Sequence, residues 1–533
     1  MKIVKLLCLI LACCTGTAYA QKINKEALRK LQLAELAIAN LYVDTVDENN
    51  LVETAIVEML KQLDPHSTYN NPEEVKEMNE PLQGNFEGIG VQFQMVEDTL
   101  LVVQPVSNGP SEKAGILAGD RIVAVNDSAI AGVKMSTEAI MKRLRGPKNS
   151  TVKLTIVRRE VNEPIYFQVK RDRIPIHSLD AAHLIEPHIG YIRINRFAAT
   201  TGEEFLNALK MLQKKGMKDL ILDLQGNGGG YLNAAIDLAN EFLNQRELIV
   251  YTQGRNSRRK EFLAKGNGHF KNGRLIVLVD EYSASASEIV TGAIQDWDRG
   301  IVVGRRTFGK GLVQRPIDLP DGSMMRLTVA RYYTPSDRCI QKPYDKNAKS
   351  GEDMLDKYHN DLINRLKHGE LMHADSIHFP DSLKYHTKKL GRTVYGGGGI
   401  MPDIFVPIDT TRYTDYHRNL VAKGAINKAT MKYIERYRKP LQSRYKKFDT
   451  FLEKFHIDQE LLDALQTIGE KEKVTFDETQ YQQSLPLIKV QLKALIARDL
   501  WDMNEYFQVM NTTNESVLKA LQILHEDRYR ELF

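Results

Sequence analysis

The chain has 533 residues, 42% of them hydrophobic, and 73 Lys and Arg against 68 Asp and Glu. This length allows three or four domains, each with a hydrophobic core. The formal net charge of +5 is spread along the chain and gives no basis for predicting nucleic-acid binding.

The first 20 residues have the composition of a secretory signal peptide. Lys2 and Lys5 precede an apolar run that ends in Ala-Tyr-Ala at residues 18–20, with small residues at the −3 and −1 positions. Cleavage before Gln21 predicts an exported protein of the bacterial periplasm or cell envelope. Cys13 leaves a lipoprotein anchor as the alternative, although the residues before it match a lipobox poorly.

Cysteine usage limits the structural chemistry of the mature chain. Three of the four cysteines lie in the signal segment, so Cys339 stands alone. No internal disulfide and no cysteine-based zinc site can therefore form. No other stretch is apolar enough to cross a membrane. The mature protein is expected to be soluble, without a structural metal.

Residues 21–83 are expected to form an N-terminal helical segment. Apolar residues at helical spacing predict two helices between residues 24 and 64. Such helices form either a dimerising or substrate-gating arm, or a small cap packed on its neighbour. The pattern alone does not separate these two interpretations.

Residues 84–172 alternate with a period of two and predict a β domain with two short helices. The Gly88-Ile89-Gly90-Val91 loop, an Ala-Gly turn at 114–115 and a Gly-Asp-Arg-Ile run at 119–122 resemble, in this order, a PDZ domain. Free N–H groups of a glycine-rich loop form a nest for a terminal carboxylate, and the adjacent strand edge can add a peptide strand. The loop residues are therefore the predicted substrate-binding residues. A β-sandwich whose glycines only make turns is the alternative.

Residues 173–410 alternate strands and helices, with helices predicted over 201–214 and 231–244. Nearly continuous apolar strands between them predict an α/β core with a buried sheet. Residues 341–395 are polar and are expected to form an insertion or surface excursion. Pro402 and the strand after it would close the sheet.

Residues 411–533 have helical periodicity almost throughout and predict a C-terminal helical domain. Asn514 or Thr513 is the expected cap of the last long helix. No motif attaches chemistry to this domain, so its expected role is mostly packing.

Two glycine motifs suggest nucleotide binding, but both depart from the required pattern. In the loop at 226–230, the third glycine of a dinucleotide fingerprint falls on Tyr231. Gly304 to Lys310 fits a Walker loop, but Gly311 stands where magnesium binding needs Ser or Thr, and no helix begins there. A nucleotide-binding protein is therefore kept only as a rival hypothesis.

The stretch from Ser283 to Gln314 is the most informative for catalysis. It places serines on a small-residue turn at a helix start and, after the next strand, Lys310 between two glycines. The nearest histidines are His269 and His359, so Lys310 is the local candidate for the base of a serine nucleophile. A buried lysine can serve because burial lowers its pKa.

Backbone donors for an oxyanion are also at hand. N–H groups at a helix start point outward, so that of Ala286 is one candidate, and Gly228 or Gly229 supplies the other. Gln314, four residues after the lysine, could hold its amine. Ser283, Ser285 and Ser287 compete as nucleophiles, and a capping turn with a solvated lysine would explain the same residues without catalysis.

A family resemblance decides between the serines. LDPHSTY at 63–69, SASASEI, GAIQDW, GRRTFGKGLVQ, YYTPSDRCIQ and GGIMPD occur in order around the PDZ-like segment. Over about residues 25–410 the chain resembles the C-terminal processing peptidases, or tail-specific proteases. These are Ser–Lys serine peptidases with a core similar to the crotonase and ClpP folds. The resemblance implies the following roles: nucleophile Ser285, base Lys310, supporting residue Gln314, and oxyanion donors Ala286 and Gly228 or Gly229.

The resemblance implies an α/β multidomain protein with a helical N-terminal segment, a PDZ-like β domain, a crotonase/ClpP-like catalytic core and a helical C-terminal domain. It implies an exported endopeptidase that acts on proteins with accessible C-terminal tails, without metal or organic cofactor. Peripheral membrane association and a homodimer stay open. Asp337 replaces a common glycine, and the 341–395 stretch is long, which affects the substrate path rather than the chemistry. A non-catalytic PDZ scaffold that binds C-terminal peptides is the alternative.

Overall fold

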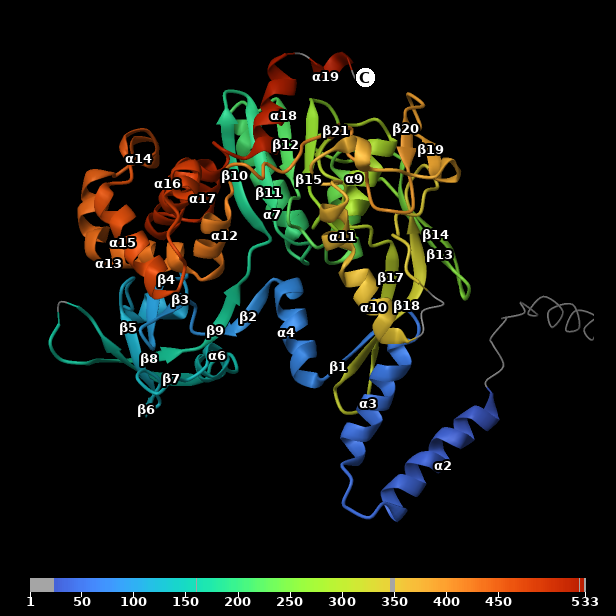
Figure 1. Cartoon of the computed structure of the whole chain (residues 1–533), viewed down its shortest axis with the longest axis horizontal. Coiled ribbons are helices and arrows are strands. Elements are labelled where there is room, and N and C mark those ends of the chain that lie inside the picture. The colour runs from blue at the N-terminus through green and yellow to red at the C-terminus, as the bar shows by residue number, and fades with distance from the viewer. Residues whose placement is uncertain (1–23, 160, 346–349, 527, 532–533) are drawn as a thin grey trace, which may run out of the picture.

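The computed structural model describes residues 24–159, 161–345, 350–526 and 528–531 (Figure 1). The predicted signal peptide and Cys13 lie outside the described residues. Among the described helices, none combines the length and the apolar character that a membrane span requires.

Both helices predicted near the N-terminus are present, as α2 (Lys25–Leu41) and α3 (Glu48–Lys61). Asn24 and Asp47 cap them by accepting hydrogen bonds from the first-turn backbone. α2 projects from the body of the protein and buries none of its residues (Figure 1). It therefore does not pack as a cap on this chain, and its role as a dimerising or gating arm stays a prediction.

The PDZ-like domain has a six-stranded antiparallel sheet with two short helices, as predicted from its periodicity. The strands are β3 (Val91–Val96), β4 (Thr99–Pro105), β5 (Arg121–Val125), β6 (Ser128–Ala129), β7 (Thr151–Val157) and β8 (Ile165–Lys170). The helices are α5 (Pro110–Ala114) and α6 (Thr137–Leu144). α4 (Pro72–Gln83) leads into the domain, and β2 (Asn85–Gly88) pairs with β9 (Asp172–Pro175) where the chain enters and leaves.

The α/β core contains a six-stranded sheet in the order β10-β11-β12-β15-β16-β21, parallel except for its first pair. The strands are β10 (Leu179–Glu186), β11 (Ile189–Ile194), β12 (Asp219–Asp223), β15 (Leu275–Val279), β16 (Ile301–Gly304) and β21 (Ile404–Phe405). α7 (Thr201–Lys214), α8 (Leu232–Asn240) and α9 (Ala286–Asp296) cover one face. As predicted, the strand after Pro402 closes the sheet.

A second sheet, which the sequence did not predict, lies beside the first. Its order is β1-β18-β13-β14, with β17 also paired to β18. The strands are β1 (Thr68–Asn70), β13 (Leu248–Gly254), β14 (Ser257–Leu263), β17 (Leu312–Asp318) and β18 (Met324–Tyr333). Through β1, the segment before the PDZ-like domain becomes an edge strand of the core.

Most described residues of 341–395 are exposed or half-buried, as expected of an insertion or surface excursion, but a few side chains pack inside. Lys342, Tyr358 and Arg365 are buried against the core. Lys342 is neutralised by Asp361 at 3.0 Å, and its ammonium lies over the ring of Tyr358, which lets a polar sequence pack inside. The elements are α10 (Gly351–His359), α11 (Asp361–Lys367), η1 (Ala374–Ser376), η2 (Asp381–Leu383), β19 (Lys384–His386) and β20 (Thr393–Tyr395).

The C-terminal region is helical, as predicted, but its helices have two different destinations. The bundle of α12 to α17 packs on the PDZ-like sheet, where Met431 contacts Leu101 and Val103 (Figure 1). α18, capped by Asn514 as predicted, covers the second face of the core sheet. The helices are α12 (Asp415–Ala422), α13 (Ala425–Arg444), α14 (Phe448–Lys454), α15 (Gln459–Lys471), α16 (Glu478–Leu500), α17 (Met503–Met510), α18 (Glu515–His525) and α19 (Arg528–Glu531).

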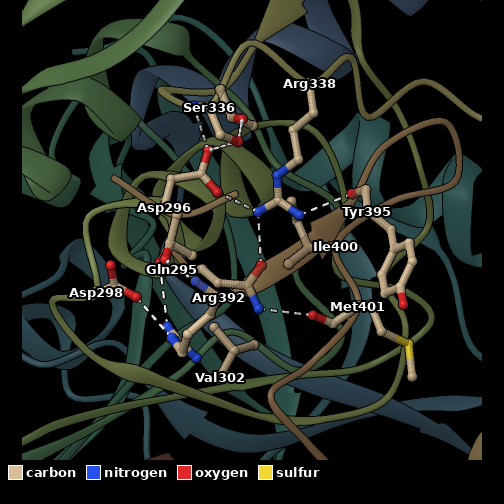
Figure 2. A network of polar contacts seen from close by, with 12 residues as sticks. Gln295, Asp296, Asp298, Val302, Ser336, Arg338, Arg392, Tyr395, Ile400 and Met401 are labelled. Atoms are coloured by element: carbon tan, nitrogen blue, oxygen red, sulfur yellow. Dashed lines mark hydrogen bonds and ion pairs between the residues drawn. The ribbon is translucent and has the colours of Figure 1, made fainter. Parts of the chain in front are cut away.

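A buried polar network ties the C-terminal end of α9 to the segment that follows β18 (Figure 2). Asp296 forms an ion pair of 2.6 Å with Arg338, and both side chains are fully buried. Arg338 also donates to the carbonyl of Tyr395, and Arg392 pairs with Asp298 at 2.7 Å. These contacts fix both ends of the 341–395 segment to the C-terminal end of α9 and the turn after it.

Candidate active site

Ser285 occupies a special backbone position at the start of α9. Its φ of 56° lies in the left-handed region, which for a residue other than glycine indicates a turn held by its surroundings. The hydroxyls of Ser283 and Ser287 are buried and donate to the carbonyls of Leu224 and Asn227, each at 2.8 Å. Of the three candidate serines, Ser285 is the one that lines the cleft.

The glycine loop after β12 lies directly against this turn. A Cβ on Gly229 would come within 2.8 Å of the Ala284 carbonyl oxygen and 3.0 Å of the Ala286 nitrogen, so only glycine fits there. The N–H of Gly229 donates to Asn227 at 2.9 Å, whereas the hydrogen bonds described for the chain include none from the N–H of Gly228 or Ala286. These two N–H groups are therefore available to a ligand.

Glu288 joins the serine turn to the lysine loop. Its fully buried carboxylate accepts hydrogen bonds from the N–H of Ser285, Gly309 and Lys310 at 2.7–2.8 Å and from the Thr307 hydroxyl at 2.5 Å. Burial raises its pKa, and the four donors oppose that shift. The sequence analysis missed this residue, although a Glu three positions after a helix-capping Ser is a known signal.

Lys310 lies in the same cleft, and its surroundings favour the neutral amine. Burial lowers its pKa most, and the nearby guanidinium of Arg326 lowers it further. The carboxylates of Glu288 and Asp64 act in the opposite direction. Because the net effect is a lowered pKa, this lysine can accept a proton more readily than an exposed one.

Gln314 also lines the cleft. Its described hydrogen bond is with Thr328 and not, as predicted, with Lys310. Its amide donates to the Thr328 hydroxyl at 3.4 Å, and that hydroxyl donates to Asp64 at 3.0 Å. Asp64 also accepts from the Ser67 hydroxyl at 2.7 Å. The LDPHSTY segment thus holds Thr328, the hydrogen-bond partner of Gln314, in place.

Behind the lysine lies a second polar chain that the sequence analysis did not assign. His66 shares a hydrogen bond of 2.8 Å with the hydroxyl of Tyr358, which also accepts from Gln341 at 3.4 Å. Gln341 in turn accepts from the N–H of Gly311 at 2.9 Å. Burial, with help from the charge of Lys310, lowers the pKa of His66 to about 3, so its ring is neutral.

The cleft has a volume of about 1360 Å³ and brings together most of the predicted catalytic residues, which are Ser285, Lys310, Gln314, Gly228 and Gly229. The PDZ-like loop is a separate site. Gly88 ends β2 and Val91 begins β3, with Gly90 between them at a φ of 73°. Within the described ranges, no group of three or more His, Cys, Asp or Glu is placed to hold a metal ion.

Comparisons with known proteins agree with this arrangement. The peptidase family S41 matches residues 188–347, and the PDZ domain matches residues 88–173. The N-terminal domain of the activating protease CtpB matches residues 13–74, and a family of unknown function matches residues 416–502. The PDZ match covers the predicted carboxylate-binding loop.

The relatives define the family. The carboxy-terminal processing protease CtpB of Bacillus subtilis is 35% identical over 61% of this chain and 68% of its own length. The carboxy-terminal-processing protease of Bartonella bacilliformis is 38% identical over 60% of this chain and 74% of its own length. The solved photosystem II D1 C-terminal processing protease is 29% identical, covering 60% of this chain and 91% of its own, with a TM-score of 0.34. The chain belongs to the carboxy-terminal processing serine proteases of family S41, with a PDZ domain.

Proposed function

We propose that this chain is an exported endopeptidase that cleaves proteins near their C-terminal tails, with Ser285 as nucleophile and Lys310 as base. One observation carries the assignment. The hydroxyl of a serine in a strained turn and a buried lysine with a lowered pKa line the same cleft. A hydroxyl becomes a nucleophile only beside a group that can take its proton.

The chemistry follows from this pair. The neutral amine of Lys310 takes the proton of Ser285 as the oxygen attacks the peptide carbonyl carbon. The resulting ammonium gives that proton to the leaving amine, and the C–N bond breaks. Water then enters, loses a proton to the amine of Lys310, and releases the acyl group by the reverse sequence.

The N–H groups of Ala286 and Gly228 are the proposed oxyanion donors. Both are free of described partners, while that of Gly229 is used by Asn227. Gly229 instead allows the loop to lie against the serine turn. Losing one such donor costs about 3 to 4 kcal/mol of transition-state stabilisation.

The PDZ domain is the proposed dock for the substrate C-terminus, through the loop Gly88-Ile89-Gly90-Val91. β3 lies at the edge of its sheet, where an extended peptide can add as a further strand. The signal-like first 20 residues support export to the periplasm or cell envelope.

The test uses the full mature chain and a folded reporter protein with an unstructured apolar C-terminal tail. Ser285→Ala and Lys310→Met are each expected to reduce cleavage by about 10⁵-fold or more, because the pair acts as a unit. Mass spectrometry of the products gives the cleaved bonds. Thermal unfolding and binding of the tail peptide should match the wild type.

Undiminished cleavage by Ser285→Ala would refute the assigned nucleophile. If the unmodified chain binds the tail and never cleaves it, the PDZ scaffold becomes the better description. Magnesium-dependent ATP binding that disappears with Lys310→Met would instead support the nucleotide-binding alternative.

A further inference from the structure

Arg326 lies in the wall of the catalytic cleft on β18. It pairs in register with Thr68 of β1 and Pro316 of β17. Residues two apart along a strand share a face, so its side chain lies on the same side as those of Thr328 and Tyr332. The guanidinium is close enough to Lys310 to lower the pKa of that lysine, which places it near the reacting bond.

This guanidinium has no carboxylate partner in the described part of the chain. Its described hydrogen bond runs from Nη1 to the sulfur of Met78 at 3.2 Å. A thioether is a weak acceptor, so most of the five N–H donors lack a protein acceptor. Two other arginines of the core are paired with carboxylates, Arg305 with Glu281 at 2.6 Å and Arg338 with Asp296 at 2.6 Å.

Half-burial without a partner is costly for a charged group. Removing a guanidinium from water is unfavourable unless an anion or strong acceptors replace the water. Burial lowers the pKa of Arg326, and no neighbouring carboxylate raises it. An arginine stays charged at neutral pH even so. The apo cleft therefore holds a preformed, unneutralised cation.

Charged side chains of both signs line the cleft besides Arg326. Glu203 on α7 and Asp237 on α8 are among them, with Arg196 and Lys265, and neither carboxylate pairs with Arg326. A carboxylate of the bound polypeptide would be attracted to the unneutralised guanidinium on β18. In an unmodified polypeptide the only anionic groups of low pKa are carboxylates.

We propose that Arg326 forms a subsite for a carboxylate of the bound polypeptide, next to the scissile bond. The proposal rests on the peptidase function proposed above. The carboxylate belongs either to an acidic side chain close to the cleaved bond or to the free C-terminus reaching the cleft. Both present two coplanar oxygens that a guanidinium binds through parallel hydrogen bonds.

The test compares matched internally quenched peptides on the full mature protein. One series carries Glu or Gln in turn at each of the positions flanking the cleaved bond, and one pair ends in a carboxylate or an amide. The readout is the ratio of kcat/KM within each pair. Any effect of Arg326 on the protonation of Lys310 acts equally on both members and cancels in this ratio.

The wild-type protein is expected to cleave the carboxylate member of one pair about tenfold faster, mostly through KM. Arg326→Gln should bring that ratio close to one, and Arg326→Lys should keep part of it. Arg258→Gln is the control, because Arg258 is exposed on β14, does not line the cleft and should leave the ratio unchanged. The responding pair tells whether the carboxylate is a side chain or the C-terminus.

Equal cleavage within every pair by the wild type would overturn the proposal, and so would a ratio that survives in Arg326→Gln. If that variant does not fold, the wild-type ratio must still fall as NaCl is added, since salt screens the charge pair; a constant ratio overturns the proposal. Ser285→Ala separates the two proposals. If it abolishes cleavage of both members while the wild type shows no preference, only the carboxylate subsite fails.

Discussion

The two ends of α9 hold buried carboxylates in opposite ways. At the C-terminal end, Asp296 is neutralised by Arg338 and also accepts from the N–H and hydroxyl of Ser336 (Figure 2). At the N-terminal end, Glu288 has only neutral donors, three backbone N–H groups and one hydroxyl. Both carboxylates are fully buried.

The difference shows what each end is for. An ion pair joins two elements firmly and cancels the charge, which suits an anchor for the segment after β18. Neutral donors do not cancel the charge of Glu288. Its carboxylate instead binds the N–H groups of Ser285 and Lys310 and so holds the serine turn and the lysine loop in place. The same helix is therefore clamped at one end, and at the other end it holds the proposed nucleophile and base in place.

Breaking the clamp should have the largest effect on stability. Arg338→Met leaves Asp296 buried without its counter-ion and is expected to lower the free energy of unfolding by about 3 to 5 kcal/mol. Urea unfolding followed by tryptophan fluorescence measures this, since Trp297 is adjacent to Asp296. The double variant Asp296→Asn/Arg338→Met should recover much of the loss. A large fall in kcat at unchanged stability would contradict the assignment as an anchor.

Glu288→Gln tests the positioning end. The amide keeps one oxygen, so two of the four donors face an NH₂ group, which costs about 2 kcal/mol of stability. We expect a larger consequence for catalysis, a fall in kcat of about 100-fold with little change in KM, because the serine and lysine lose their fixed separation. An unchanged kcat measured on folded protein would remove the functional distinction between the two ends.

The pH dependence of kcat/KM tests the electrostatics around Lys310. The base must be neutral, so activity is lost as the pH falls through its pKa. Because burial and Arg326 lower that pKa, the midpoint should lie below the ordinary value of 10.5. Arg326→Gln should move the midpoint upward. A midpoint at or above 10.5 in the wild type would show that the amine is not desolvated.

A smaller effect is expected from His66, behind the same lysine. Its pKa is lowered from 6.5 to about 3 by burial, so below pH 6.5 the unfolded chain binds a proton that the folded chain does not. Stability therefore falls as the pH drops through this window, by about 1 kcal/mol at pH 5.5. His66→Gln should flatten the profile by this amount. His183, whose pKa is also lowered, to about 4, contributes equally to both proteins.

Local patterns predicted the elements that position the site, because their information lies within a few residues. The helix predicted over 201–214 has the same bounds in the structure, as α7. The turn at Ser285 and the loop at Lys310 also fall where the motifs predicted. Their catalytic roles stay predictions that come from family resemblance.

The missed residues depend on contacts between distant segments. His66 and Tyr358 meet although 292 positions separate them, and no periodicity reports such a contact. The few buried polar residues of 341–395 were missed for a related reason. Polar residues predict a surface unless they find partners, and Lys342 finds Asp361 and two aromatic rings.

The position of α18 has a consequence for how the enzyme is made. Val517, Ala520 and Ile523 cover the face of the core sheet opposite α7, α8 and α9, yet they follow all the motifs that are proposed to carry the chemistry. During synthesis, a nascent chain that has released those motifs still exposes one apolar side of its sheet to solvent. The core sheet is therefore covered on both faces only after α18, which ends at His525, has packed against it.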